Sequence, residues 1–590
     1  MEGTTSDPTQ RRERLADRVG ATHVVSGQVI RQRGDSVVVR ATLYRGREVV
    51  TEADAQGPAG NAIALAEAVG IQLLAAAAGE FSRLPALMTS STEAVQLWLK
   101  GQRAYRDGEF QRAVELQWDA LKVDSTFALS AWNMMKSAQW LDPSDPWFRE
   151  GRRLAWQHRD RLPRPDSMIF VAESYRNNYP ERIGERRSFA LYQQSVREYP
   201  ERWDAWLLYG DYLWHEGGIY IDDGRAKAVD AFEKALALDS LGHDEPWQHL
   251  EEHYLMTADW AGLARLPERH RSRSSAILKK MMTGDSLDAA TWDSLAARYG
   301  WPIHGLAQLQ AAGQGMAAAE RLAAVLERRA ETGDGNSAQA AGIFWLNRGR
   351  PDRAIPLLHV ADTGDECRGN PCQEPAMWLE DGLFADLPAG VAQQVRDSLR
   401  SADTDMRIDD INGDRPTRFG LYDRLAGQVW SALWDLRGGD RAEAENTIRL
   451  ARQAEAIAER PGPKHSMGLY AALLEAAVAV QDGREDAVPA VARLDSAFGI
   501  TIPDQRHAAA WLLVQADLFA RIGQPEKALS AIRRQWVAGG EERTHFLTAR
   551  LLMRARLAWQ LGLRDEATQA YDHYLAPRSD PEPALADLVA

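Results

Sequence analysis

Residues 93–125 read EAVQLWLKGQRAYRDGEFQRAVELQWDALKVDS, and this stretch decides the fold expected for most of the chain. Two amphipathic segments flank Asp107-Gly108, a dipeptide that favours a turn. Small residues stand at the three positions where two antiparallel helices would cross, namely Gly101, Ala113 and Ala120. Larger side chains there would push the helices apart. The stretch therefore predicts a hairpin of two packed helices.

The hairpin pattern recurs along the chain. It returns in residues 204–240, in GIFWLNRGRPDRAIPLL at 342–358 and in ADLFARIGQPEKAL at 516–529. Further small positions lie roughly 40 residues apart near the C-terminus, at Ala444, Ala487, Ala528 and Ala567. These hairpins resemble tetratricopeptide repeats, whose period is about 34 residues. We therefore expect a mainly α protein, a tetratricopeptide-type α-solenoid of stacked helical hairpins; another class of helical solenoid would be the alternative.

The N-terminal residues have a different pattern, typical of β-strands. Three β-branched runs, HVVSGQVIRQ, SVVVRATLYR and REVVTEADA, lie within residues 23–55, and an alanine-rich helix is expected at 61–78. The segment LADRVGATHVVSGQVIRQRGDSVVVRATLYR resembles the second half of the TolB-like N-terminal domain of bacterial membrane-anchored serine/threonine kinases and some winged-helix regulators. In that family tetratricopeptide repeats follow. The resemblance covers about residues 12–80, lacks the first half of that domain, and implies a chain derived from part of a larger gene.

These patterns divide the chain into segments. Two stretches, DTGDECRGNPCQEP and DMRIDDINGDRPTRFG, are rich in Gly, Pro, Asp and Asn and predict loops. The expected order is a partial TolB-like α/β domain at 1–82, a tetratricopeptide block at 85–275, degenerate helical repeats at 276–360, a loop-rich break at 361–420, a second tetratricopeptide block at 421–578 and a tail at 579–590.

Charge and hydropathy narrow the classes of partner. The formal net charge is −14 and the arginines are scattered among acidic residues, so the chain should repel phosphate backbones and we expect no nucleic-acid partner. The most apolar stretch, residues 62–79, contains Glu67 and Gln72 and is better explained as an amphipathic helix than as a membrane span. The expected partner is therefore a protein or peptide, without direct membrane insertion.

The compartment and the state of the two cysteines are linked questions. Residues 1–18 are polar and charged and show no signal peptide, which favours the cytoplasm for the chain as written. The kinase resemblance implies an extracytoplasmic position if the chain is a fragment of a membrane-anchored protein. Cys367 and Cys372 flank RGNP, so they would form a disulfide in an oxidising compartment and remain free thiols in a reducing one.

Three short motifs resemble catalytic or metal-binding sequences, but other residues that each site requires do not match. Residues 158–160 match the catalytic-loop triplet of protein kinases, but the other kinase motifs are missing. His249 and His253 stand four apart, yet Leu250 follows where a zincin has glutamate. Residues 410–415 resemble the opening of a calcium loop, but an arginine stands where that loop needs glycine. We expect no catalytic residue, no metal and no cofactor.

The tetratricopeptide resemblance implies that the first helix of each hairpin lines a peptide-binding groove. The residues expected to face it are Trp98, Gln102, Tyr105, Asp204, Asp211, Trp214, Asp517, Arg556 and Trp559. Aromatic side chains with charged neighbours are suitable anchors for an extended peptide. The alternative for each aromatic residue is packing between adjacent hairpins.

The sequence thus predicts a non-catalytic scaffold that binds a protein or peptide. The kinase resemblance implies the sensor or interaction part of a bacterial signalling system. Two other classes remain open: a helical-repeat module of a transcriptional regulator lacking its DNA-binding domain, and an α/α-toroid carbohydrate-active enzyme. A toroid would close on itself and bring two catalytic carboxylates together at its mouth.

Overall fold

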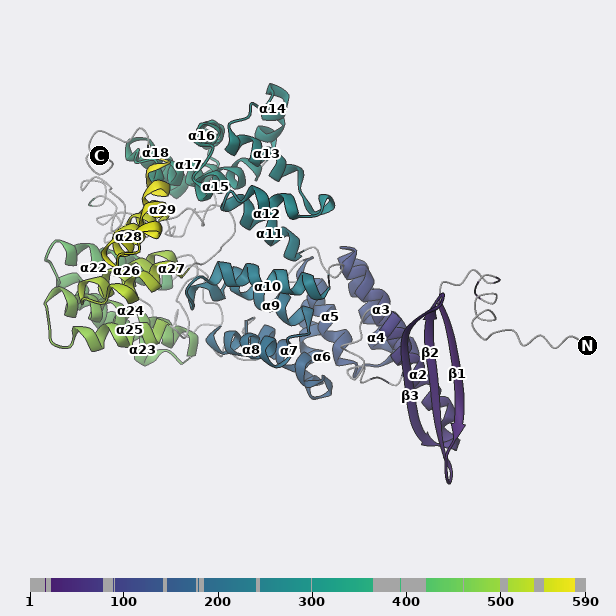
Figure 1. Ribbon diagram of the computed structural model, residues 1–590. Helices are drawn as coiled ribbons and strands as arrows, with labels where there is room; N and C mark the ends of the chain where they lie inside the picture. Colours follow the sequence, from purple (N-terminus) through teal and green to yellow (C-terminus); the bar gives the residue numbers. More distant parts are fainter. Residues whose placement is uncertain are drawn as a thin grey trace, which may run out of the picture. The chain divides into compact units, whose positions relative to one another are not determined.

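The computed structural model of the chain (Figure 1) describes residues 23–77, 91–141, 146–176, 185–239, 245–298, 300–363, 421–459, 461–498, 508–534 and 546–578, with residues 16, 18, 89, 179 and 393. The chain divides into two compact units. Unit 1 comprises Met1–Asn177 and Gln194–Arg202; unit 2 comprises Asn178–Gln193 and Trp203–Ala590. This division falls inside the block predicted at 85–275. Among the helices of the described residues, none combines the length and hydrophobicity that a bilayer span requires.

A small antiparallel sheet opens unit 1 (Figure 1). It consists of β1 (His23–Arg31), β2 (Ser36–Arg45) and β3 (Glu48–Pro58), in that order, and α2 (Ala62–Ala77) packs on it. Alternate residues of β2 point to one face, and Val39, Ala41 and Leu43 share a buried cluster with Val69 and Leu73 of α2. The predicted three-stranded piece followed by a helix is confirmed.

The rest of unit 1 is helical. Its helices are α3 (Thr92–Arg106), α4 (Phe110–Val123), α5 (Ala128–Gln139), α6 (Pro146–Gln157), α7 (Arg164–Arg176) and the end of α8 (Glu185–Glu198). The first hairpin, α3 and α4, forms as its sequence predicts. Ser91 caps α3, because its side chain accepts a hydrogen bond from the Ala94 amide. The turn that follows α3 uses Gly108 at φ +76°, a backbone conformation that favours glycine.

The small crossing positions of this hairpin are buried as predicted. Ala113 and Ala120 are fully buried. A Cβ atom at Gly101 would stand 2.5 Å from Nε2 of Gln117 on α4, so only glycine fits there without rearrangement. The same crowding recurs in unit 2, where a Cβ at Gly342 would stand 2.6 Å from Cγ of Leu358.

Unit 2 is built from further helices. They are α9 (Trp203–His215), α10 (Gly224–Leu238), α11 (Glu245–Met256), α12 (Trp260–Arg265), α13 (Arg273–Thr283), α14 (Ala289–Ala297), α15 (Trp301–Ala312), α16 (Met316–Ala330), α17 (Gly335–Asn347), α18 (Pro351–Thr363), α22 (Leu421–Arg437), α23 (Ala442–Ile457), α24 (Pro461–Gln481), α25 (Ala487–Phe498), α26 (Ala508–Arg521), α27 (Pro525–Arg533), α28 (Leu547–Gln560) and α29 (Arg564–Leu575). Consecutive helices pack as hairpins, among them α9 with α10, α17 with α18, α22 with α23, α24 with α25, α26 with α27 and α28 with α29. The alanines predicted at the crossings, residues 444, 487, 528 and 567, are all buried. The mainly α fold of stacked helical hairpins is therefore confirmed.

Unit 2 also contains contacts between hairpins that are far apart in sequence. Arg348 at the end of α17 donates from Nη1 to the Pro577 carbonyl oxygen at 2.7 Å, and Thr548 on α28 donates to Asn347 at 3.2 Å. His573 on α29 lies 3.3 Å from the Gln310 carbonyl oxygen. In a linear solenoid each repeat contacts only its neighbours. The stack in unit 2 is therefore not purely linear, since the C-terminal hairpin also packs on α15 and α17.

Gly151 provides a test of the close packing of helices in unit 1. A Cβ atom there would stand 2.8 Å from both the Ala131 carbonyl oxygen and the Met135 amide nitrogen on α5. Backbone atoms cannot move aside as a flexible side chain can. Gly151→Ala is therefore expected to lower the free energy of unfolding of unit 1 by about 1–3 kcal/mol, measured by urea unfolding.

The control for this prediction is Gly70→Ala on α2, where a Cβ would meet no neighbour within 4 Å. That change should stabilise the helix by about 0.5–1 kcal/mol, because alanine loses less backbone entropy than glycine on folding. Equal effects of the two substitutions would contradict the close approach of α5 and α6.

Candidate functional site

Three of the residues predicted to face a groove are instead in the core. Trp98, Asp204 and Trp214 are at most 2% exposed, so they cannot contact a ligand on the surface of the folded protein. The Trp98 ring packs against Phe127, with ring centroids 6.1 Å apart, and Trp214 packs against Phe232 at 6.2 Å. The prediction fails for the two tryptophans because large rings fill the space between neighbouring helices. Asp204 accepts a hydrogen bond from the Ala205 amide at 3.1 Å.

Other predicted groove residues are at least partly accessible. Tyr105 and Gln102 are half-buried, and the hydroxyl of Tyr105 accepts a hydrogen bond from Nε1 of Trp140 at 3.2 Å. Arg556 and Trp559 are exposed, and the guanidinium of Arg564 lies 3.6 Å from the centroid of the Trp559 ring. A role for these four residues in ligand binding stays a prediction.

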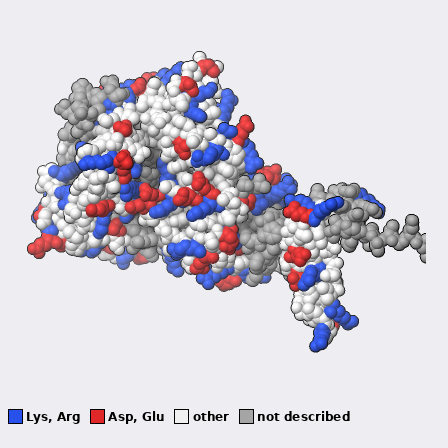
Figure 2. All heavy atoms as spheres, viewed as in Figure 1, with Lys and Arg blue, Asp and Glu red and all other residues white. Residues whose placement is uncertain are grey.

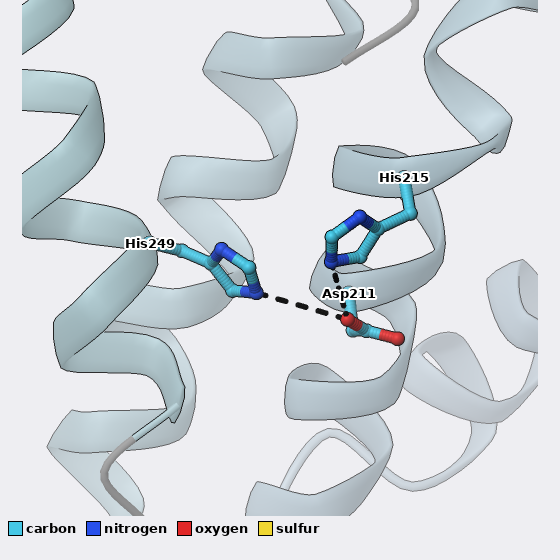
Figure 3. A group of neighbouring side chains, drawn as sticks. All are labelled: Asp211, His215 and His249. Carbon is cyan, nitrogen blue, oxygen red and sulfur yellow. Dashed lines mark ion pairs between the residues drawn. The ribbon is translucent and has the colours of Figure 1, made fainter. Parts of the chain in front are cut away.

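Asp211, another predicted groove residue, lies between two histidines (Figure 3). Its Oδ1 is 3.3 Å from Nε2 of His215, one turn further along α9, and 3.8 Å from Nε2 of His249 on α11. In the sequence His249 stands four residues before His253, but the structure brings it to Asp211 and His215. Burial, aided by the charge of Arg225, lowers the pKa of His253 to about 4, so that imidazole is neutral at pH 7.

The remaining predicted residue, Asp517, lines a recess in unit 2. The recess has a volume of about 430 Å³, including space open to solvent, and lies on α22, α24 and α26, each the first helix of its hairpin. Its apolar lining consists of Leu433, Leu436, Ala477, Val514 and Leu518, and its polar lining consists of Arg437, Gln481, Asp517 and Arg521. The α26 residues are spaced at i, i+3, i+4 and i+7, which places them on one helix face.

The polar groups of the recess interact with one another. Arg521 lies 3.7 Å from Asp517, measured from Nη1 to Oδ2, and donates a hydrogen bond from Nη2 to the Gln481 side chain. Desolvation raises the pKa of Asp517 above its ordinary value, although the charges of Arg521 and Arg437 oppose this shift. Two guanidinium groups beside one carboxylate give the polar edge of the recess a net positive charge.

The sequence contained an unused signal for the polar residues that were missed. Arg437, Gln481 and Arg521 are the last residues of α22, α24 and α26. Each stands two positions before a glycine with positive φ, at residues 439, 483 and 523. They therefore occupy equivalent positions in three successive hairpins. Aligning the repeats on their turn glycines would have grouped them.

The other chemical motifs add nothing to this site. Arg159, in the kinase-like triplet, donates from Nη1 to the Trp156 carbonyl oxygen at 2.7 Å, near the end of α6. The two cysteines and the calcium-like residues 410–415 lie outside the described residues. Figure 2 shows basic and acidic side chains intermingled on the face in view, without a large area of one sign among its described residues.

Comparison with known proteins does not assign the chain to a family. No protein-family model matches it, and no curated protein matches it. A solved structure described as an APC/C hetero-tetramer, Cut9-Hcn1, is similar at 12% sequence identity over 85% of this chain and 96% of that chain, with a TM-score of 0.23. A score that low does not establish a common fold, so the architecture rests on the packing described above.

Proposed function

We propose that the chain is a non-catalytic scaffold that binds a segment of another protein, and that the recess on α22, α24 and α26 is a binding site. The main support for this proposal is that the recess combines an apolar lining with two arginines, all on the first helices of successive hairpins. An apolar side chain of a bound peptide would be buried against Leu436 and Leu518. This burial contributes affinity but does not specify the sequence of the peptide.

The charges of the recess favour one chemical class of peptide. An acidic side chain or terminal carboxylate next to the apolar anchor would pair with Arg437 or Arg521, because guanidinium groups bind carboxylates bidentately. Asp517 would repel a second negative charge and so restrict how such a peptide lies. The expected ligand is a segment that combines one large apolar residue with a nearby acid.

The recess is less suited to sugar hydrolysis. That reaction uses a pair of carboxylic groups placed about 5–10 Å apart across the bond to be cleaved. Among the recess residues Asp517 is a single carboxylate beside two arginines. The scaffold function is therefore preferred over the α/α-toroid enzyme. A place in bacterial signalling, or in a transcriptional regulator, is a further proposal supported only by the resemblance of the N-terminal residues to TolB-like domains.

The proposal is tested with a displayed library of random twelve-residue peptides and the full chain. Enriched peptides should pair an acid with Leu, Ile or Phe. Reversing both charges with Arg437→Glu and Arg521→Glu should weaken a selected peptide at least about tenfold by calorimetry, since each change turns an attraction into a repulsion.

Arg484→Glu serves as the matched control. Arg484 lies between α24 and α25, pairs with Asp486 at 2.7 Å and has a half-exposed side chain. The same reversal of charge there should leave affinity within about twofold, a difference of about 0.4 kcal/mol. Selection of peptides without acidic residues, or equal losses at both places, would reject the recess as the binding site.

A further inference from the structure

Asp211, His215 and His249 form a cluster that peptide binding does not explain. The three side chains each offer one ligand atom, and these atoms all lie within 4.8 Å of one another. Two come from α9, one turn apart, and the third comes from α11 (Figure 3). Two imidazoles and one carboxylate form a ligand set typical of Zn²⁺ and related divalent ions.

The distances fit a shared ion better than they fit tight hydrogen bonds. Ligand atoms held about 2.0–2.1 Å from a tetrahedral Zn²⁺ are about 3.3–3.4 Å apart. Oδ1 of Asp211 lies 3.3 Å and 3.8 Å from Nε2 of His215 and His249. Both values exceed the 2.7–2.9 Å usual for charge-assisted N–H···O bonds. All three ligand atoms lie within 4.8 Å of one another, so they would need to move closer to occupy three corners of one tetrahedron.

Packing around the cluster holds part of it in place and leaves another part accessible. The His249 ring stacks on Phe232, with centroids 5.0 Å apart and an interplanar angle of 20°. The side chains of Asp211 and His249 are only 10% and 12% exposed, whereas that of His215 is 41% exposed. An ion could therefore enter past His215 and meet two ligands whose positions are largely set, which lowers the entropic cost of binding.

We propose that Asp211, His215 and His249 bind one divalent transition-metal ion of the Zn²⁺ type, with a fourth position open to water or a ligand group. Bound metal would join α9 to α11, which belong to successive parts of the helical stack. It would also place a positive charge beside the largely shielded carboxylate of Asp211. The site is structural or ligand-binding and is independent of the recess on α22, α24 and α26.

The experiment is a cobalt titration of the full chain after removal of metal with a chelator. Co²⁺ replaces Zn²⁺ in such sites and gives visible d–d absorption that reports the ligand geometry. One Co²⁺ per chain should produce these bands, and added Zn²⁺ should abolish them. Asp211→Asn and His249→Gln should each weaken binding by roughly tenfold or more, since loss of a residue that merely orients a ligand costs about 10–100-fold and these changes alter the ligands themselves.

His253→Gln is the matched control, since His253 lies one turn beyond His249 on the same helix. It should keep the stoichiometry and affinity of the unaltered chain. Circular dichroism of every variant checks that the helices are retained. A sulfur-to-cobalt charge-transfer band would place the metal on Cys367 and Cys372 and overturn the proposal. Metal binding that is absent, or that is unchanged in Asp211→Asn and His249→Gln, would overturn it as well.

Discussion

Replacing Arg202 with Met is expected to lower the free energy of unfolding of unit 1 by about 3–5 kcal/mol. Arg202 is 2% exposed and Asp166, at the start of α7, is fully buried. Nη2 and Nη1 of the arginine reach the two carboxylate oxygens at 2.8 and 3.4 Å. Without the guanidinium, the buried Asp166 carboxyl group loses the ion pair with Arg202, and the cost of its desolvation arises in the folded state alone.

The comparison is Arg164→Met, which removes a second ion pair of the same region. Arg164 pairs with Glu198 at 3.2 Å, but its side chain is 72% exposed. The expected loss is only about 0–1 kcal/mol, because water screens the pair. Hydrogen exchange across α7 and residues 199–202 should therefore rise strongly in Arg202→Met and little in Arg164→Met. Adding Asp166→Leu to Arg202→Met should restore part of the protection; a further loss would contradict the ion-pair explanation.

Replacing Arg348 with Ala is expected to loosen the C-terminal hairpin by about 1.5–3 kcal/mol. Arg348 is buried, donates to the Pro577 carbonyl oxygen and pairs with Glu320. It therefore connects the end of α17 to the end of the last hairpin. Its loss removes a charge-assisted hydrogen bond and leaves the Pro577 carbonyl without that donor, while the contacts within α28 and α29 are retained.

Hydrogen exchange measured by mass spectrometry would locate this effect. Protection should fall across α28 and α29 and stay constant across α22 and α23. Arg350→Ala is the matched control, since Arg350 forms a local bridge to Asp352 at 2.8 Å. Unchanged exchange in α28 and α29 of Arg348→Ala would mean that the fold-back contacts do not stabilise unit 2.

The helical hairpins could be predicted because their causes are local. Turn glycines such as Gly108, and small crossing residues such as Gly101 and Ala120, act between helices that are adjacent in sequence. The packing of α28 and α29 on α15 and α17 could not be predicted in this way. It joins residues more than 200 positions apart, as Thr548 and Asn347 show, and no periodic pattern encodes such a contact.

The candidate sites were predicted less well than the fold. The repeat pattern indicates which helix would line a groove but not how deeply its neighbours cover each side chain. Trp98 and Trp214 were therefore predicted to face a groove although they are buried. Asp517 does line the recess, yet its arginine neighbours come from a second helix as well as its own. The pairing of His249 was missed for the same reason, since Asp211 and His215 lie on a different helix.

By itself the sequence determined the class of the protein: an N-terminal three-stranded piece, then paired helices whose small residues allow close crossings. These features follow from propensity, turn chemistry and residue size, which act over a few residues. Only the tertiary structure decided which side chains are buried, which helix ends meet at the recess, and that a carboxylate from α9 meets an imidazole from α11. Those outcomes depend on the packing of helices that are distant in sequence. In a close-packed interior, the position of each side chain depends on the side chains around it.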